Sequence, residues 1–296
     1  MKGKYICILF GILVLNSFAF STVPKRAVST SQFTTEILLS IGAEKQMIGT
    51  AWLDNPILPE LKEKYDKIPV LSEKNMSKEL FYSVEPDFLT GWDSILDRKN
   101  LGPVEELKNN GVRVLIIKSL KSNKIETVYA DILELGKIFN LEKNAKEVIE
   151  KMEKELTEIK VTLPVEKKKI FAYDSGTILP FTIGGSGIPN TLIELAGGKN
   201  IFSETNGNFI NGSWEKVLGE NPEFILIVDY GSSTAESKIK FLKEKSPIKD
   251  LEAVKNNKFI VVGLEYLSAG IRMNQGVKKI AIGLHGERKN AIDKIN

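Results

Sequence analysis

Residues 143–160 read KNAKEVIEKMEKELTEIK, and the two halves of the chain lie on either side of this stretch. Its apolar residues recur at the three- and four-residue spacing of a single helix face: Ala145, Val148, Ile149, Met152, Leu156 and Ile159. A helix of this length spans about 27 Å, the width of a small domain, and Pro164 prevents its continuation. Taken alone, the pattern is typical of an ordinary amphipathic surface helix. The flanking sequences favour a rigid bridge between two lobes.

The sequences on the two sides of this helix repeat the same motifs in the same order. Glu79 lies seven residues before Pro86, and Glu215 lies seven residues before Pro222. A serine stands two residues ahead of each glutamate, where its hydroxyl can cap a helix start. A helical segment ending in glycine recurs at residues 36–42 and 191–197, and a Lys-Asn-Asn sequence precedes a strand at 108–110 and again at 255–257. Matches that keep one order predict two lobes that are built alike.

Apolar strands alternate with helices along both halves. The predicted strands are residues 26–31, 47–51, 87–92, 112–117, 170–174 and 224–230. Because most are apolar on both faces, they are typical of parallel sheets covered by helices. The sequence therefore predicts an α/β protein with two Rossmann-like lobes, each built on a central, mostly parallel sheet, joined by one long α-helix. The expected segments are a signal peptide at 1–21, an N-terminal lobe at 22–140, the bridging helix at 141–163 and a C-terminal lobe at 164–296.

The first residues have the features of a secretory signal. Lys2 and Lys4 precede an apolar run that is too short to span a membrane with ease, and Ala19-x-Ser21 is a small-x-small cleavage pattern. Cys7, the only cysteine, lies inside that run without the small residues that a lipid-attachment site needs. We therefore expect a periplasmic protein that is not lipidated, has no disulfide and has no thiolate metal site. A membrane anchor is the alternative.

The net charge of the chain is +3, and the signal carries two of those charges. The remaining charge of about +1 argues against a nucleic-acid partner. We expect the mature protein to be a monomer.

The best candidate site lies where the strands end, because ligands of parallel sheets bind at the carboxyl ends of the strands. Aromatic faces, a few polar groups and one cation are suited to a bulky, planar or partly anionic ligand. We expect ligand contacts from Ser31, Trp52, Asp54, Trp92, Asp93, Asp174, Ser175, Phe181, Tyr230, Tyr266 and Arg272, with Ser29, Thr30 and Asp229 beside them. For Arg272 the alternative is a solvated loop residue, and we expect Trp214 to pack at a helix start.

Other motifs give weaker signals. The sequence Gly184-Gly-Ser-Gly187 matches neither the dinucleotide nor the phosphate-loop spacing, so a flexible turn is favoured, although Ser186 could offer backbone donors to an anion. His285 is the only histidine and lies late in the chain. A closed metal site needs several histidines or carboxylates. Catalysis by a Ser–His or Cys–His pair is disfavoured, because the chain has one histidine and its one cysteine lies in the predicted signal. We expect no intrinsic metal, no catalytic residue and no enzyme activity.

Glu79 and Glu215 allow two interpretations. Acidic residues at helix starts are stabilised by the helix dipole. Two equivalent exposed carboxylates, one per lobe, would also match a partner with two-fold symmetry. The residues by themselves do not separate these possibilities.

An ordered set of motifs resembles the substrate-binding proteins of ABC importers for siderophores, haem and cobalamin, in particular the helix-linked class. The motifs are Ser29–Ser31 through Glu36–Ala43 and Ile48-Gly49, Ser77-x-Glu79, Glu85-Pro86-Asp87, Leu135–Phe139, Leu195–Ile201, Ser213-Trp-Glu215, Asn221-Pro222 and Ala253–Asn256. The resemblance covers nearly all of the mature chain. It implies two lobes joined by a helix that bends little on ligand binding. It also implies that Glu79 and Glu215 dock on arginines of an ABC permease dimer.

Within that family, Gly49–Asp54, Gly91-Trp92-Asp93 and Arg272 are most similar to receptors labelled as binding iron, metal chelates or a deazaflavin cofactor. The resemblance favours a receptor for a metal chelate, in the first place a ferric siderophore-like one, with iron or cobalt present only as part of the chelate. A single cleft arginine does not suit a highly anionic catecholate. Cobalamin, haem or a deazaflavin-like cofactor is the alternative ligand. A secreted α/β enzyme acting on a cofactor-like substrate is the alternative from another class, and turnover would distinguish it.

Overall fold

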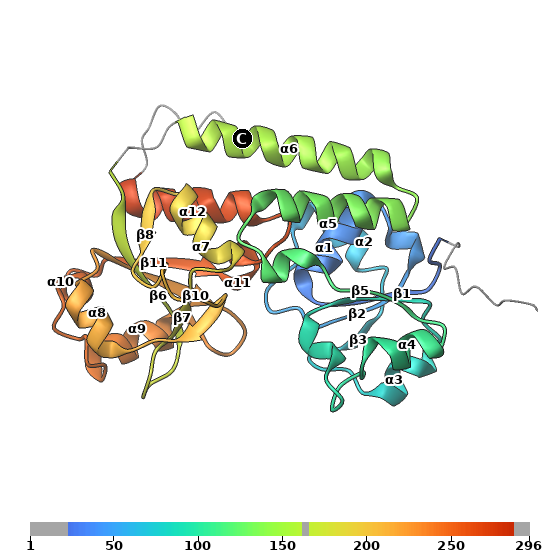
Figure 1. Cartoon of the computed structure of the whole chain (residues 1–296), viewed down its shortest axis with the longest axis horizontal. Helices are drawn as coiled ribbons and strands as arrows, with labels where there is room; N and C mark the ends of the chain where they lie inside the picture. The colour runs from blue at the N-terminus through green and yellow to red at the C-terminus, as the bar shows by residue number, and fades with distance from the viewer. Residues whose placement is uncertain (1–22, 162–165, 287–296) are drawn as a thin grey trace, which may run out of the picture.

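The computed structural model describes residues 23–161 and 166–286, and it contains two α/β lobes that lie side by side (Figure 1). The predicted signal peptide lies outside these residues. The fold class expected from the sequence is confirmed: each lobe has a mostly parallel sheet, and one long helix runs across both lobes. Within the described residues, no helix is both long enough and apolar enough to cross a bilayer.

The N-terminal lobe contains a sheet with the strand order β3-β2-β1-β4-β5 in which every neighbouring pair is parallel. The strands are β1 Ala27–Thr30, β2 Met47–Ala51, β3 Val70–Ser72, β4 Phe88–Gly91 and β5 Arg113–Leu115. The helices are α1 Gln32–Ile41, α2 Lys62–Tyr65, α3 Lys78–Ser83, α4 Val104–Asn109 and α5 Ile125–Ile138, with short 3-10 turns η1 Glu44–Gln46, η2 Pro59–Leu61, η3 Asp93–Leu96 and η4 Lys118–Lys121.

The C-terminal lobe has the strand order β11-β10-β6-β7-β9, and β8 pairs with β6. The strands are β6 Lys168–Ser175, β7 Phe181–Ile183, β8 Gly198–Asn200, β9 Phe209–Asn211, β10 Phe224–Asp229 and β11 Phe259–Gly263. The helices are α7 Ile188–Leu195, α8 Trp214–Glu220, α9 Ala235–Glu244, α10 Glu252–Lys255, α11 Leu264–Leu267 and α12 Met273–His285. The strands β7 and β9 run antiparallel to their neighbours, which the repeated motifs did not predict. A short loop joins β6 to β7, and only antiparallel strands can be joined in that way.

Local capping explains where the repeated helices begin and end. The Ser77 hydroxyl accepts a hydrogen bond from the Leu80 N–H at the start of α3, and Ser213 caps α8 in the same way. Gly42 ends α1 with a left-handed φ of 90°, a conformation that glycine adopts at little cost. These boundaries follow the sequence pattern closely.

The bridging helix α6 spans Glu142–Val161 and lies along the top of both lobes, over α5 and α12 (Figure 1). Its predicted apolar stripe is buried at Ala145, Met152, Leu156 and Ile159. Among the described side chains of this helix, Lys143 pairs with Glu147 at 3.8 Å and Lys151 pairs with Glu155 at 3.9 Å. Such long, exposed pairs add little stability, so packing is what holds α6 in place.

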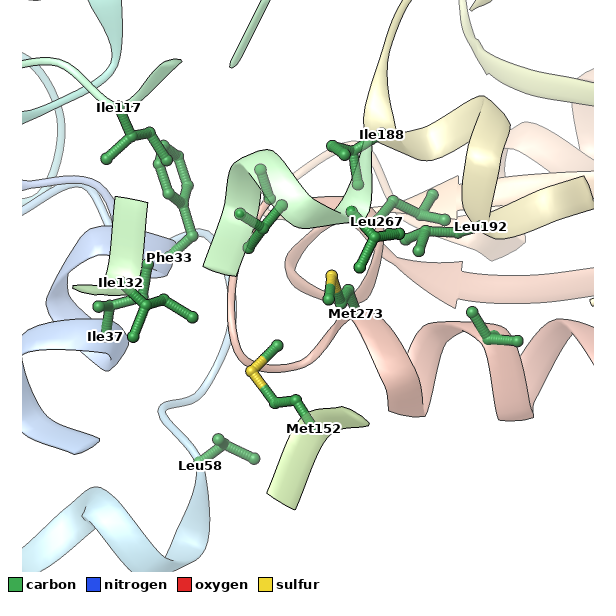
Figure 2. Close-up of a cluster of buried hydrophobic side chains, with 14 of the residues drawn as sticks. Phe33, Ile37, Leu58, Ile117, Ile132, Met152, Ile188, Leu192, Leu267 and Met273 are labelled. Atoms are coloured by element: carbon green, nitrogen blue, oxygen red, sulfur yellow. The ribbon is translucent and has the colours of Figure 1, made fainter. Parts of the chain in front are cut away.

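The main hydrophobic core is continuous between the lobes. Figure 2 shows Phe33 and Ile37 from α1, Met152 from α6, and Leu192 and Met273 from the C-terminal lobe in one cluster. Burying an apolar side chain of this size contributes about 1.5–3 kcal/mol. The two lobes therefore share buried surface as well as a connecting helix.

Candidate functional site

A pocket of about 280 Å³ opens between the lobes at the carboxyl ends of several strands. Six of the residues predicted from strand ends line it together: Trp52, Asp54, Trp92, Asp174, Phe181 and Tyr230. Both lobes contribute to its wall, because the strand ends of the two sheets face one another.

The N-terminal wall is built around Trp52, which directly follows β2. Its backbone has a left-handed φ of 56°, an unfavourable conformation for a bulky residue and one that is concentrated at binding sites. The Trp52 indole Nε1 donates a hydrogen bond to Asp54 Oδ1 at 3.1 Å. Burial raises the pKa of the Asp54 carboxyl above its usual value, and the Trp52 bond opposes that shift in part. The Trp92 ring meets Phe33 edge-on at 4.6 Å between centroids, which fixes its position.

The C-terminal wall consists of stacked rings and one buried carboxylate. The rings of Phe181 and Phe209 stack at 5.9 Å with an interplanar angle of 20°. The Tyr230 hydroxyl donates to Asp174 Oδ1 at 2.7 Å. Burial and this hydrogen bond to a carboxylate raise the pKa of Tyr230, so it stays a protonated donor.

Lys238 is a buried cation that lies against the Tyr230 ring. Its Nζ is 4.2 Å from the centre of the Tyr230 ring and donates to the Val228 carbonyl oxygen. Burial lowers the pKa of this lysine. The residues that line the pocket include five aromatic rings and two carboxylates, and none of those lining residues is a lysine or arginine.

Backbone and side-chain contacts join the two walls at the edge of the pocket. The Gly231 N–H donates to the Asp54 carbonyl oxygen at 3.3 Å, and Asn55 Nδ2 donates to the Asp229 carbonyl oxygen at 3.4 Å. Asn55 also donates to the Glu265 carboxylate. Because these bonds cross between lobes, they fix the relative position of the aspartates on either side.

Arg272, predicted as a cleft residue, is not among the residues that line this pocket. Arg272 is only 3% exposed. Its Nε and Nη2 donate hydrogen bonds to the Glu36 carboxylate on α1. Nη2 also donates to the Pro56 carbonyl oxygen at 2.8 Å. The Arg272 charge is therefore paired with a buried carboxylate, because an unpaired charge at that depth would be very unfavourable.

Four other predicted contacts also lie outside the pocket lining. Tyr266 packs against the Arg272 guanidinium at 5.3 Å. Ser31 is fully buried as the N-cap of α1, and Asp93 is exposed with Lys121 Nζ at 3.5 Å. Ser175 is half-buried beside the pocket residue Asp174. The neighbouring Ser29 and Thr30 are buried in β1. Asp229 accepts a hydrogen bond from the Ala235 N–H at the start of α9.

Three lining residues were missed from the sequence: Ser94, Phe209 and Leu264. Leu264 directly follows β11, so the strand-end argument could have found it. Phe209 lies on an antiparallel strand that the sequence pattern did not reveal. Ser94 lies in the 3-10 turn after Trp92.

In the glycine-rich turn, the Ser186 N–H that was expected to be available to an anion is already hydrogen-bonded within the protein. The N–H groups of Gly184, Gly185 and Ser186 donate to the carbonyls of Asn208, Thr205 and Gly207 at 2.8–3.0 Å. Trp214 packs in the core as expected, and its Nε1 donates to the Thr177 carbonyl oxygen. Among the residues that the structure describes, no group of three or more His, Cys, Asp and Glu side chains is placed to hold a metal ion.

Glu79 and Glu215 occupy equivalent places in the two lobes. Each is the second residue of a serine-capped helix, α3 or α8, and each is exposed. Both helices lie on the side of their sheets away from α6 (Figure 1). The Glu79 backbone N–H and the Ser77 hydroxyl lower the pKa of the Glu79 carboxyl, so it is ionised at neutral pH.

Comparisons with known proteins agree with this architecture. Residues 28–266 match the family model described as periplasmic binding protein. The crystal structure of a periplasmic binding protein from Veillonella parvula superposes with a TM-score of 0.84 at 35% identity, covering 90% of this chain and 93% of that one.

Two curated relatives are similar at lower identity. The vitamin B12-binding protein of Pectobacterium atrosepticum is 23% identical over 77% of this chain and 79% of its own length. The high-affinity heme uptake system protein IsdE of Staphylococcus aureus is 24% identical over 95% of this chain and 96% of its own length. Together with the bilobal fold and its inter-lobe pocket, these matches show that the chain belongs to the periplasmic binding protein family, in the class of substrate-binding proteins that contains these relatives.

Proposed function

We propose that this protein is the substrate-binding receptor of an ABC importer and that it captures a metal chelate in the pocket between its lobes. The family consists of substrate-binding components that deliver small molecules to a permease. The aromatic wall supports a chelate or macrocycle, because flat apolar faces stack on rings at little entropic cost. Iron or cobalt would enter as part of that ligand, so the metal is cargo.

The observation that carries the proposal is the composition of the pocket wall. Five aromatic rings surround the carboxylates Asp54 and Asp174, and no lysine or arginine is among the lining residues. Bringing a polyanion against the half-buried Asp54 and the buried Asp174 is unfavourable, because the repulsion is weakly screened there. A neutral or positively charged ferric siderophore, such as a hydroxamate chelate, therefore fits better than a tris-catecholate.

Cobalamin is the ligand that the comparisons favour as the alternative. The vitamin B12-binding relative supports it, and cobalamin is also bulky, largely neutral and rich in apolar surface. The enclosed volume of about 280 Å³ is at the small end for ligand pockets, so either ligand would extend beyond it. Haem is less suited, because its two carboxylates would face the two aspartates. The match to a haem uptake protein keeps haem among the candidate ligands. A deazaflavin-like cofactor, expected from the sequence resemblance, is a further candidate.

The first experiment identifies the native ligand. The mature protein, purified from its own periplasm, is analysed by native mass spectrometry with elemental analysis for iron and cobalt. An iron-bearing ligand of siderophore mass supports the main proposal, and a cobalt-bearing corrinoid supports the alternative.

Titration separates the ligand classes if the protein is purified empty. Ferrioxamine B, ferrichrome, cyanocobalamin, haemin and a ferric tris-catecholate are added, and tryptophan fluorescence gives each Kd.

Trp92→Ala should raise the Kd for the chelate at least tenfold, because truncation of a central aromatic residue in a binding site can cost that much. Tight binding of the tris-catecholate alone would contradict the charge argument, and turnover of any ligand would favour an enzyme.

The same proposal assigns Glu79 and Glu215 to permease docking. They are exposed, ionisable and equivalently placed, one on each lobe. Two such carboxylates fit two symmetry-related arginines on a dimeric partner. We infer that a monomer delivers its ligand in this way, and that the chain reaches the periplasm through a cleaved signal, without a lipid anchor.

A further inference from the structure

The loop between β6 and β7 exposes two adjacent apolar side chains at its tip. Ile178 is 89% exposed and Leu179 is 50% exposed. A single exposed apolar residue is ordinary on a protein surface. Two neighbours at the tip of one loop form a small apolar surface that would be better covered.

Hydrogen bonds at the base of the loop hold this tip in place. The Tyr173 hydroxyl donates to the Gly176 carbonyl oxygen at 3.0 Å, and Trp214 Nε1 donates to the Thr177 carbonyl oxygen at 3.2 Å. Both donors come from buried aromatic residues of the C-terminal lobe. The apolar tip is therefore presented on a fixed base, which lowers the entropy that a partner would have to remove on binding.

The hydrogen bond from Trp214 connects the loop to the start of α8, where Glu215 lies. Trp214 is the first residue of that helix and Glu215 is the second. Leu218, 44% exposed, follows three residues later and so lies on the same face of the helix as Glu215. In Figure 1, the β6–β7 loop and α8 both lie on the side of the C-terminal lobe away from α6.

We propose that three exposed apolar side chains bind an apolar surface of the permease around the arginine that pairs with Glu215. We call these side chains the docking collar: Ile178, Leu179 and Leu218. This inference rests on the proposed function of an importer receptor. An exposed ion pair alone raises affinity only about twofold to fivefold. Apolar residues around a charged pair exclude water from it, which strengthens the attraction and adds buried area of their own.

The pocket itself does not account for the exposed tip. Asp174 and Phe181, on either side of the loop, line the pocket, whereas Ile178 and Leu179 do not. A role in ligand binding is therefore the less direct explanation, and the test includes it as an outcome.

The test measures binding of the full protein to its permease complex in phospholipid nanodiscs. Ile178→Ser combined with Leu179→Ser should weaken binding about tenfold and leave the Kd for ferrioxamine B and the unfolding midpoint unchanged. Val261→Ser is the matched control, because Val261 is a 47% exposed apolar residue on β11 of the same lobe. That control should bind the permease as the unmodified protein does.

Three results would overturn the collar. Unchanged permease binding by the double serine variant would show that the tip makes no contact. A weaker Kd for ferrioxamine B would make the tip a ligand contact, and an equal loss of binding to empty nanodiscs would make it a lipid contact. Glu79→Arg with Glu215→Arg tests docking itself. If that variant loses binding while the serine variant retains it, only the collar fails, and if it binds normally, the docking role fails.

Discussion

Glu36 and Arg272 lie 236 residues apart in the chain and form a buried ion pair. The pair joins α1 of the N-terminal lobe to the segment that begins α12 of the C-terminal lobe. The Glu36 carboxylate also accepts a hydrogen bond from the Leu58 N–H at 3.3 Å. With its hydrogen bonds satisfied in this way, the pair fixes how the lobes meet.

Arg272→Met should destabilise the protein by about 3–5 kcal/mol, because it leaves the Glu36 charge buried without a partner. Adding Glu36→Gln should recover part of that loss, since one of the two buried carboxylates that Arg272 pairs with, Glu36 and Glu265, is then neutral. Urea unfolding measures both variants. The control is Lys62→Met in the exposed pair with Asp66, which should change stability by less than about 1 kcal/mol. A single variant as stable as the unmodified protein would contradict the role of the pair.

Asp54 should make the affinity of the pocket depend on pH. Burial raises its pKa above the usual value, so the carboxylate becomes protonated at a higher pH than an ordinary aspartate does as the solution is acidified. Affinity for a cationic chelate should therefore fall as pH decreases through this raised pKa, because the attracting charge is lost. Titrations with ferrioxamine B at a series of pH values measure the effect. Asp54→Asn should remove most of this dependence; an unchanged profile would show that Asp54 does not interact with the ligand.

At the scale of elements, α6 is held by its buried stripe and by polar contacts to both lobes. The Asn144 side chain donates to the Ile41 carbonyl oxygen of α1 at 2.8 Å. The Asn274 side chain on α12 donates to the Met152 carbonyl oxygen at 2.6 Å. Met152 itself is part of the core cluster that both lobes share (Figure 2). The helix is therefore packed against the rest of the molecule over its apolar face.

Met152→Ala should lower the free energy of unfolding by about 2–5 kcal/mol, the usual cost of truncating a buried side chain of this size. Lys154→Ala, on an exposed face of the same helix, should change it by about 0.5 kcal/mol or less. Chemical denaturation measures both. Equal effects of the two substitutions would indicate that α6 is only loosely attached to the lobes.

At the scale of the whole molecule, the bridging helix, the shared core and the Glu36–Arg272 pair all oppose a large change in the angle between the lobes. Ligand binding should therefore change the radius of gyration by less than about 1 Å. Small-angle X-ray scattering of the empty protein and of the protein saturated with its chelate measures this difference. A decrease of several ångströms would show that the lobes close like a hinge.

Docking also belongs to the whole molecule, because it needs both lobes at once. Glu79→Arg with Glu215→Arg should abolish uptake in cells and leave the Kd for the ligand unchanged, since neither residue lines the pocket. Glu236→Arg is a matched control: Glu236 is exposed and is the second residue of α9, a helix capped by Thr234. Normal uptake by the double variant would refute the docking assignment.

Most elements of this protein could be predicted from the sequence, because their signals are local. Helical spacing marked α6, serine and glycine caps marked the ends of several helices, and apolar runs marked most strands. Strand ends also identified six pocket residues, since the carboxyl ends of parallel strands meet at one edge of a sheet. The tertiary structure alone decided which distant groups meet. Arg272 had many possible partners in the sequence, and only folding placed the buried Glu36 carboxylate against it. The antiparallel strands β7 and β9 were likewise set by long-range pairing, which short apolar segments do not specify.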